Sequence, residues 1–186
     1  MKYKVIYADP PWHYNNSGCR GAAENEYNVM KDDDIYKLPI RELADPDSVL
    51  LLWATWPKLI EAMKVIDCWG FKYVTGMPWL KVNQVTNGLF GEVEFKSPYG
   101  IGFWVRGCSE PILIAKRGNV KPPLDGFIGL LSPNMFHSRK PESIYEYAES
   151  LEGPRLELFA RVERDGWNVY GNEVKNSIQL PNWEIK

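Results

Sequence analysis

The chain has 186 residues, of which 45% are hydrophobic and 25% charged, and its formal net charge at pH 7 is −2. These values predict a single globular domain over residues 1–186 with a substantial core, and bulk charge gives no indication of a nucleic-acid partner. No apolar run approaches the roughly 20 residues of a membrane span, and no signal or transit peptide is recognisable. Because the three cysteines and two histidines are scattered, we expect no metal site, no disulfide framework and a cytoplasmic location.

The first half of the chain predicts two buried strands with a long loop between them. Residues 3–8 are expected to form a buried strand, with an apolar run over 5–8, that ends at Asp9. Residues 13–31 are polar and contain several Gly and Asn, and a loop of that length is often functional. A short helix is expected over residues 32–38. The continuous apolar run over residues 48–54 indicates a strand that is covered on both faces of its sheet.

The second half alternates helices and strands. A helix is predicted to begin at Pro57 and to end at Gly70, because apolar residues recur between them at helical spacing. The later expectations, in chain order, are a strand over 71–80 broken near Gly76 and Pro78, irregular structure over 82–110, a strand over 110–115, a loop over 117–135, a helix from Pro141 to Gly153, and strands over 155–160 and 167–170. This alternation predicts an α/β fold, with a largely parallel central sheet flanked by helices.

Ligands of such sheets bind beyond the carboxyl ends of the strands. The residues expected at those ends are Asp9, Ala54-Thr55, Lys81 and Arg161. Of these, Asp9 begins the segment with the most distinctive chemistry, so it is the first candidate site residue.

The tetrapeptide Asp9-Pro10-Pro11-Trp12 suits the binding of a flat ring that carries an exocyclic amino group. The Asp9 carboxylate and the Pro10 carbonyl can accept both amine hydrogens. Because neither proline has a backbone N–H, the nearby carbonyls are expected to lack a local competitor. The Trp12 indole offers a face for stacking, which contributes roughly 1–3 kcal/mol for a base. The alternative interpretation is a stiff loop followed by a core tryptophan.

Motifs of other enzyme classes are missing from the sequence. There is no Gly-x-Gly-x-x-Gly after a strand, no Walker A sequence, no Gly-x-Ser-x-Gly and no His-Glu-x-x-His. Dinucleotide-dependent, P-loop, serine-hydrolase and zinc-protease functions therefore lack their usual residues.

Ordered segments along nearly the whole chain resemble the MT-A70 family of adenine-N6 methyltransferases, which use S-adenosylmethionine. The segments that carry the resemblance are, in order, Asp9-Pro-Pro-Trp12, Tyr27-Asn-Val-Met30, Leu50-Leu-Leu-Trp53-Ala-Thr55, Trp79-Leu-Lys81-Val-Asn83-Gln84, Gly102-Phe-Trp104, Glu110, Ser138-Arg-Lys140-Pro141-Glu142, Glu157-Leu-Phe159-Ala-Arg161 and Gly171-Asn172-Glu173. Each segment is weak alone, and their order makes the set specific. The resemblance implies a permuted Rossmann-like methyltransferase fold, because the catalytic segment precedes the cofactor segment.

The resemblance also implies roles for individual residues. The catalytic residues would be Asp9, Pro10, Pro11 and Trp12. S-adenosylmethionine would be bound by Asp9, Lys140, Glu157, Phe159, Arg161, Asn172 and Glu173, with Glu157 orienting Arg161. The nucleic-acid substrate would contact His13, Tyr27, Lys81, Trp104, Arg106 and Glu110.

Several alternatives remain open at this level. The same motif chemistry serves N4 of cytosine, the polymer can be DNA or RNA, and a non-catalytic nucleic-acid-binding subunit would keep the fold. The intact Asp9-Pro10-Pro11-Trp12 motif argues against the last of these. We favour DNA, because the chain resembles minimal bacterial or phage members of the family. The sequence shows no separate target-recognition module, which leaves room for a homodimer or a partner subunit.

Overall fold

The computed structural model describes residues 1–14, 29–87, 92–96, 104–105, 107–123, 130–133 and 140–180, with side chains for all of these except 83–87, 92–96 and 130–133. The elements are, in chain order, β1 (Tyr3–Ala8), α1 (Asp32–Tyr36), α2 (Ile40–Leu43), β2 (Ala44–Trp53), the 3₁₀ turn η2 (Trp56–Lys58), α3 (Leu59–Cys68), β3 (Lys72–Asn87), β4 (Glu92–Lys96), β5 (Ser109–Arg117), β6 (Leu130–Pro133), α4 (Glu142–Glu149), β7 (Arg155–Leu158) and β8 (Trp167–Tyr170). Among the described residues, no helix is long and apolar enough to cross a membrane.

The strands form one sheet in the order β4-β3-β5-β2-β1-β7-β8, with β6 paired to β3 off this path. β1 pairs in parallel with β2 and β7, and β7 with β8, so the strands that flank the candidate site run in one direction. β3 and β6 are also parallel, whereas β5 is antiparallel to both β2 and β3. The predicted α/β architecture with a largely parallel sheet is confirmed.

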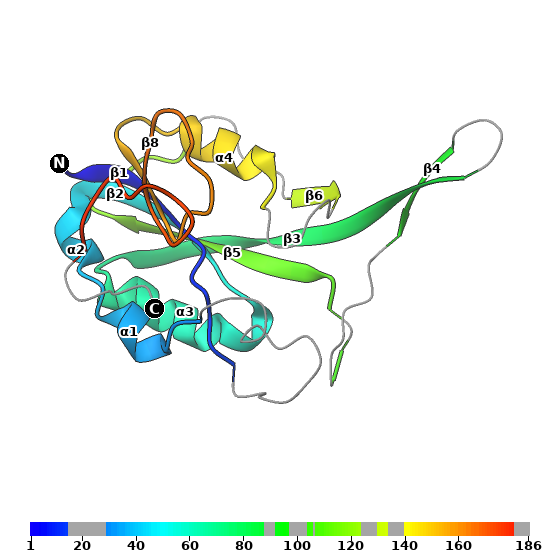
Figure 1. Ribbon diagram of the computed structural model, residues 1–186, viewed down its shortest axis with the longest axis horizontal. Helices are drawn as coiled ribbons and strands as arrows, with labels where there is room; N and C mark the ends of the chain where they lie inside the picture. The colour runs from blue at the N-terminus through cyan, green and yellow to red at the C-terminus, as the bar shows by residue number, and fades with distance from the viewer. Residues whose placement is uncertain are drawn as a thin grey trace.

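Helices cover both faces of this sheet. α1, α2 and α3 pack on one face and α4 packs on the other (Figure 1). Successive side chains of a strand point to opposite faces. In β1, Ile6 and Ala8 therefore join the core on the α3 side, while Val5 and Tyr7 join the core on the α4 side. Because both faces are buried there, β1 is apolar from Val5 to Ala8.

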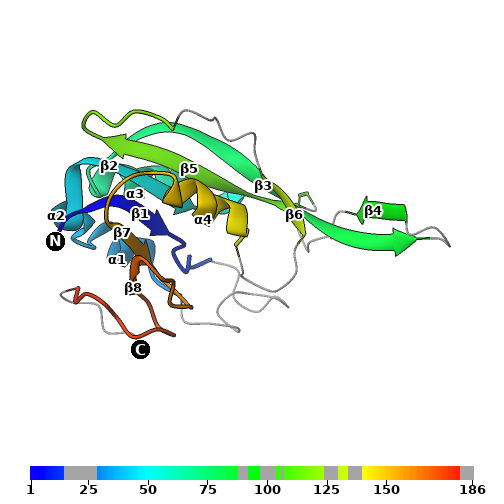
Figure 2. The same ribbon diagram turned by 90° about the horizontal axis from the view of Figure 1, so that it is seen from above.

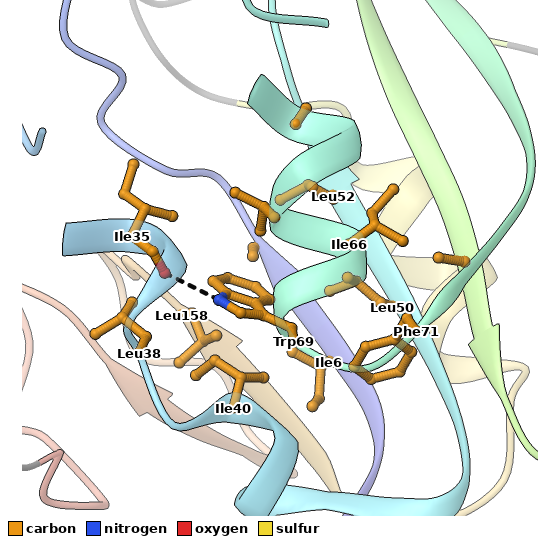
Figure 3. Packing of buried hydrophobic residues seen from close by; sticks show 14 of the residues in the cluster. Ile6, Ile35, Leu38, Ile40, Leu50, Leu52, Ile66, Trp69, Phe71 and Leu158 are labelled. Carbon is orange, nitrogen blue, oxygen red and sulfur yellow. Dashed lines mark hydrogen bonds between the residues drawn. The ribbon is translucent and has the colours of Figure 1, made fainter. Parts of the chain in front are cut away.

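The larger core is organised around Trp69, which is fully buried at the end of α3 (Figure 3). Its indole Nε1 donates a hydrogen bond to the Ile35 carbonyl at 2.9 Å, which joins α1 to α3. Ala62, Val65 and Ile66 of α3 recur at helical spacing and face this core, whereas Ile60 is exposed. Gly70 follows at φ +83°, the left-handed conformation that ends many helices, so the predicted helix end is confirmed.

The region after β3 differs from the sequence expectation. β3 does not break near Gly76 and Pro78 but continues to Asn87, and it extends with β4 as a ribbon beyond the body of the sheet (Figure 2). The strand continues through Pro78 because its register partner on β5 is Pro111, so neither residue needs a backbone N–H donor from the other. The sequence also predicted a loop where β6 forms.

Candidate active site at the carboxyl edge of the sheet

The segment Asp9–Trp12 leaves the carboxyl end of β1 and is fixed by the protein around it. The Trp12 indole Nε1 donates to the Trp53 carbonyl at the end of β2, at 3.3 Å, and the Pro11 carbonyl accepts a hydrogen bond from the Met30 amide at 2.8 Å. Trp12 is 4% exposed, so its ring belongs to the core and offers almost no free face for stacking in this conformation. The core interpretation of this tryptophan, which the sequence left open, describes its present position.

The Pro10 carbonyl has a local competitor that the sequence did not predict. The Trp12 amide donates to this oxygen at 2.9 Å, across a tight turn of three residues. A carbonyl oxygen has two lone pairs, so it can still accept a second hydrogen bond. The Trp12 amide therefore orients the Pro10 carbonyl and does not exclude an amine hydrogen.

The two residues after Trp12 lie against the end of β2. The Tyr14 hydroxyl and the Thr55 hydroxyl are 2.5 Å apart and share a hydrogen bond. His13, a predicted substrate contact, is half-buried between these anchor points. The first residues of the predicted loop are thus attached to the sheet, while residues 15–28, including the predicted contact Tyr27, lie outside the described residues.

Four charged side chains from four different elements meet beside this segment. The Lys140 ammonium, just before α4, lies 3.0 Å from Asp9 Oδ2 and 3.0 Å from Glu110 Oε2. Glu110, near the start of β5, also forms an ion pair with Lys81 of β3. The order Asp9–Lys140–Glu110–Lys81 alternates negative and positive charge. We call these four residues the charge cluster; it unites residues that the sequence assigned to catalysis, to the cofactor and to the substrate.

The two carboxylates of the charge cluster differ in their protonation. Burial raises the pKa of Asp9 above its usual value, and the Lys140 ammonium offsets only part of that rise. Burial also acts to raise the pKa of Glu110, but two lysines, Lys140 and Lys81, outweigh it and hold this pKa below its usual value. Burial acts to lower the pKa of Lys140, and the two carboxylates reverse this, so its pKa is raised. Glu110 and Lys140 therefore stay ionised at neutral pH, and Asp9 is the better proton acceptor of the two carboxylates.

Two tryptophans that the sequence analysis did not assign to the site wall the charge cluster. The Lys140 ammonium lies 4.9 Å from the Trp53 ring centroid and 6.0 Å from that of Trp79, distances typical of cation–π contacts. The two rings meet edge to face, with centroids 5.8 Å apart. The Trp53 indole also donates to the Tyr7 hydroxyl at 2.7 Å, which fixes its orientation. The sequence signal that could have found these two tryptophans is their position near the ends of the strands predicted over 48–54 and 71–80.

Glu157 accepts a hydrogen bond from a tyrosine of α4. The Tyr145 hydroxyl of α4 donates to Glu157 Oε1 at 2.9 Å, and the Tyr145 ring stacks on Tyr7 with centroids 4.7 Å apart. Burial raises the pKa of Glu157 from 4.5 to about 7. Arg161 pairs with Glu173 at 3.6 Å, with both side chains largely exposed.

The chain turns sharply after β7 and brings the other predicted cofactor residues together. Phe159 has φ 65°, which ends the strand two residues earlier than predicted. The Ala160 amide then donates to the Tyr170 carbonyl at 3.0 Å. Gly171 packs so closely on Ala160 that a Cβ atom placed on it would lie 1.9 Å from the Ala160 carbonyl oxygen. This contact holds the segment containing Arg161 beside the segment containing Asn172 and Glu173.

The structure describes only one of two other predicted substrate contacts, Trp104 and Arg106. Trp104 is 98% exposed, so it does not pack against the site. Arg106 lies outside the described residues. Within the described part of the chain, no group of three or more His, Cys, Asp or Glu side chains is arranged to hold a metal ion.

Comparison with known proteins identifies the family to which these features belong. The MT-A70 family model matches residues 3–173, from the first residue of β1 to Glu173. The chain belongs to the MT-A70 family. The resemblance that the ordered motifs indicated is therefore confirmed.

The chain covers different shares of the length of its relatives. It is 26% identical to the type II methyltransferase M.MunI of Mycoplasma sp, over 97% of this chain and 82% of that protein. It is 31% identical to the human N(6)-adenine-specific methyltransferase METTL4, over 92% of this chain and 37% of that protein. It is 28% identical to an Arabidopsis thaliana N(6)-adenosine-methyltransferase MT-A70-like protein, over 97% of this chain and 25% of that protein. The chain thus spans well under half the length of the plant and human relatives.

Proposed function

We propose that this MT-A70 protein is an S-adenosylmethionine-dependent methyltransferase that modifies the N6 amine of adenine in nucleic acid, with DNA favoured over RNA. The observation that carries the proposal is the placement of Asp9 and the Pro10 carbonyl at the carboxyl end of β1, beside Lys140. The names of the human and plant relatives support adenine as the base and N6 as the target. The whole of residues 1–186 would act as one catalytic domain.

The residues at this edge match the chemical groups of S-adenosylmethionine. Lys140 offers a buried ammonium for the methionyl carboxylate, and Arg161, Asn172 and Glu173 offer polar groups for the ribose hydroxyls. The close contact between Gly171 and the backbone at residue 160 is what sets these polar groups side by side. When bound, the cofactor supplies an electrophilic methyl group on a positively charged sulfur.

The chain's contribution to the transfer is to hold the amine and to polarise it. The Asp9 carboxylate and the free lone pair of the Pro10 carbonyl accept the two N–H bonds of the exocyclic amine. This favours a pyramidal nitrogen, whose lone pair then points away from the ring instead of being delocalised into it. Because these contacts strengthen as the nitrogen becomes pyramidal, they stabilise the transition state more than the ground state. A base within a duplex must first be flipped out of the stack to reach Asp9.

The charge cluster explains how Asp9 becomes available to the amine. In the present structure the Asp9 carboxylate forms an ion pair with Lys140, so the amine must displace Lys140 from Asp9. Glu110 lies equally close to Lys140, at 3.0 Å, and its lowered pKa keeps it negatively charged. Lys140 therefore keeps a carboxylate partner when Asp9 turns to the substrate. The raised pKa of Asp9 also suits it to accept the proton that the amine loses on methylation.

Sequence specificity and assembly belong to the same proposal. The described part of the chain contains one sheet with its helices, so specificity would come from loops, from a homodimer or from a partner subunit. The expected location is the cytoplasm of a bacterium or of a phage-infected cell, where genomic DNA is accessible.

The test is transfer of a tritiated methyl group to matched DNA and RNA oligonucleotides with and without adenine, followed by nucleoside analysis of the product. We expect N6-methyladenine, more on DNA than on RNA. Asp9→Ala should lower the rate by about 10²–10³-fold or more, the scale for loss of one preorganised group that stabilises the transition state. Cofactor affinity, measured by calorimetry, should fall far less than the rate, because Lys140, Arg161, Asn172 and Glu173 would still hold the cofactor.

The matched control is Asp67→Asn, which alters an exposed carboxylate near the end of α3, outside the residues assigned to the site. It should leave the rate unchanged. Turnover retained by Asp9→Ala would refute the mechanism. N4-methylcytosine as the product would show that cytosine, and not adenine, is the substrate. Cofactor binding without turnover would favour a non-catalytic subunit.

A further inference from the structure

Trp56 is a large aromatic side chain that the structure holds in place but does not bury. It begins η2, directly after β2, and is 49% exposed. Its indole Nε1 donates to the Ser109 hydroxyl at the start of β5, at 2.9 Å. Pro57 follows it and restricts the backbone of the turn. The ring is thus fixed in orientation with about half of its surface free, a combination suited to stacking because little conformational entropy is lost on contact.

The position of Trp56 is continuous with the candidate active site. Thr55, the preceding residue, shares a hydrogen bond with Tyr14 of the catalytic segment. Trp53, two residues earlier again, accepts the Trp12 indole hydrogen bond at its carbonyl. The turn that carries Trp56 and the segment that carries Asp9 are therefore attached to each other at the same edge of the sheet.

Strand geometry places Trp56 beside the charge cluster and not within it. Its partner Ser109 directly precedes Glu110 on β5, and the register partner of Ser109 on β3 is Leu80, which directly precedes Lys81. Neighbouring residues of a strand point to opposite faces, so Ser109 and Leu80 face away from Glu110 and Lys81. Leu80 is 39% exposed, and its side chain lies on the same face of the sheet as that of Ser109, the partner of Trp56.

We propose that Trp56 stacks on a base that neighbours the target adenine in the nucleic-acid strand. This inference rests on the proposed function and adds a substrate contact outside the residues that hold the target. A strand whose target base reaches Asp9 passes across this edge, and the adjacent bases come to lie against the surface formed by Trp56 and Leu80. Stacking on an indole tolerates any base, so Trp56 contributes affinity and positioning with little sequence preference.

The test measures binding of a fluorescently labelled single-stranded DNA oligonucleotide with one adenine, by anisotropy. Trp56→Ala should weaken binding about 5- to 150-fold, the scale of one base–aromatic stack. Trp56→Phe keeps an aromatic face and should lose less than Trp56→Ala. The matched control is Tyr73→Ala. Tyr73 is also half-exposed, at 45%, but it lies at the start of β3, away from the position of Leu80. Its binding should equal that of the wild type.

A second set of oligonucleotides, each with one neighbouring base replaced by an abasic spacer, identifies the stacking partner. At one spacer position the wild type and Trp56→Ala should bind equally, because the contact is already absent. Three results would each overturn the proposal: wild-type binding by Trp56→Ala, an equal loss at every spacer position, or no oligonucleotide binding by the wild type. A fourth result that would overturn the proposal is a change of oligomeric state in Trp56→Ala, measured by light scattering, because it would assign the surface to a second copy of the chain.

Failure of the proposed function gives a different result. If the wild type binds the oligonucleotides but forms no N6-methyladenine, the reaction is wrong and the binding series still decides the role of Trp56. If the wild type methylates adenine and Trp56→Ala behaves as the wild type in both assays, the reaction stands and the stacking contact is wrong.

Discussion

Glu157→Gln is expected to stabilise the protein at alkaline pH and to leave its stability unchanged in acid. Glu157 is buried on β7, and that burial raises its pKa from 4.5 to about 7. An acid with a raised folded-state pKa binds more protons when folded, so the free energy of unfolding falls as pH rises from about 4.5 to about 7. A pKa difference of about 2.5 corresponds to about 3 kcal/mol of unfolding free energy at pH 8. Glutamine cannot ionise, and it keeps an oxygen that accepts the Tyr145 hydrogen bond.

Urea denaturation of the wild type and the variant at several pH values between 4 and 8 measures this difference. The two unfolding free energies should agree at pH 4 and separate progressively, with the variant about 3 kcal/mol more stable at pH 8. Glu152→Gln, an exposed position in the turn after α4, is the matched control and should follow the wild type throughout. A variant that is no more stable than the wild type at pH 8 would refute the reasoning, because Glu157 would then carry no penalty for ionising in the fold.

Two further substitutions test the packing that positions the site. Gly171→Ala should cost about 1–3 kcal/mol of stability and weaken cofactor binding, because its Cβ would meet the backbone of Ala160, and calorimetry with denaturation measures both. Gly107→Ala, where nothing lies within 4 Å of the added atom, should be neutral, and an equal effect of the two changes would contradict the packing argument. Trp69→Phe should cost about 1–3 kcal/mol in denaturation, since it removes the hydrogen bond to Ile35 and leaves a small cavity; an unchanged midpoint would contradict that account.

The sequence predicted the segment Asp9–Trp12 well because everything it depends on is local. An apolar run that ends in a carboxylate indicates a buried strand whose last residue reaches the edge of the sheet, and β1 ends at Ala8. The helix that ends at Gly70 was predictable for the same reason, since spacing and a terminating glycine are read within one segment. Local patterns did not predict the hydrogen bond from the Trp12 amide to the Pro10 carbonyl, because it depends on the turn geometry that the surrounding core imposes.

The partners of the predicted site residues could not be read from the sequence in the same way. Lys140 was expected to bind the cofactor, and nothing near it in the chain indicates that Asp9 and Glu110 lie 3.0 Å away. Likewise, Glu157 was expected to orient Arg161, four residues on, whereas its hydrogen-bond donor Tyr145 comes from α4. Contacts between residues far apart in the chain depend on strand order and direction, which composition and periodicity leave undetermined.

Strand direction is what gives the charge cluster its second carboxylate. β5 runs antiparallel to β2 and β3, so its first residues, and not its last, lie at the edge where β1 delivers Asp9. Had β5 been parallel to its neighbours, Arg117 would stand at that edge in place of Glu110 and would add positive charge beside Lys140. The antiparallel strand instead supplies a carboxylate that holds Lys140 when Asp9 turns to the amine. The departure from a uniformly parallel sheet is therefore a requirement of the proposed mechanism, because Asp9 can release its ion pair without leaving a buried ammonium unpaired.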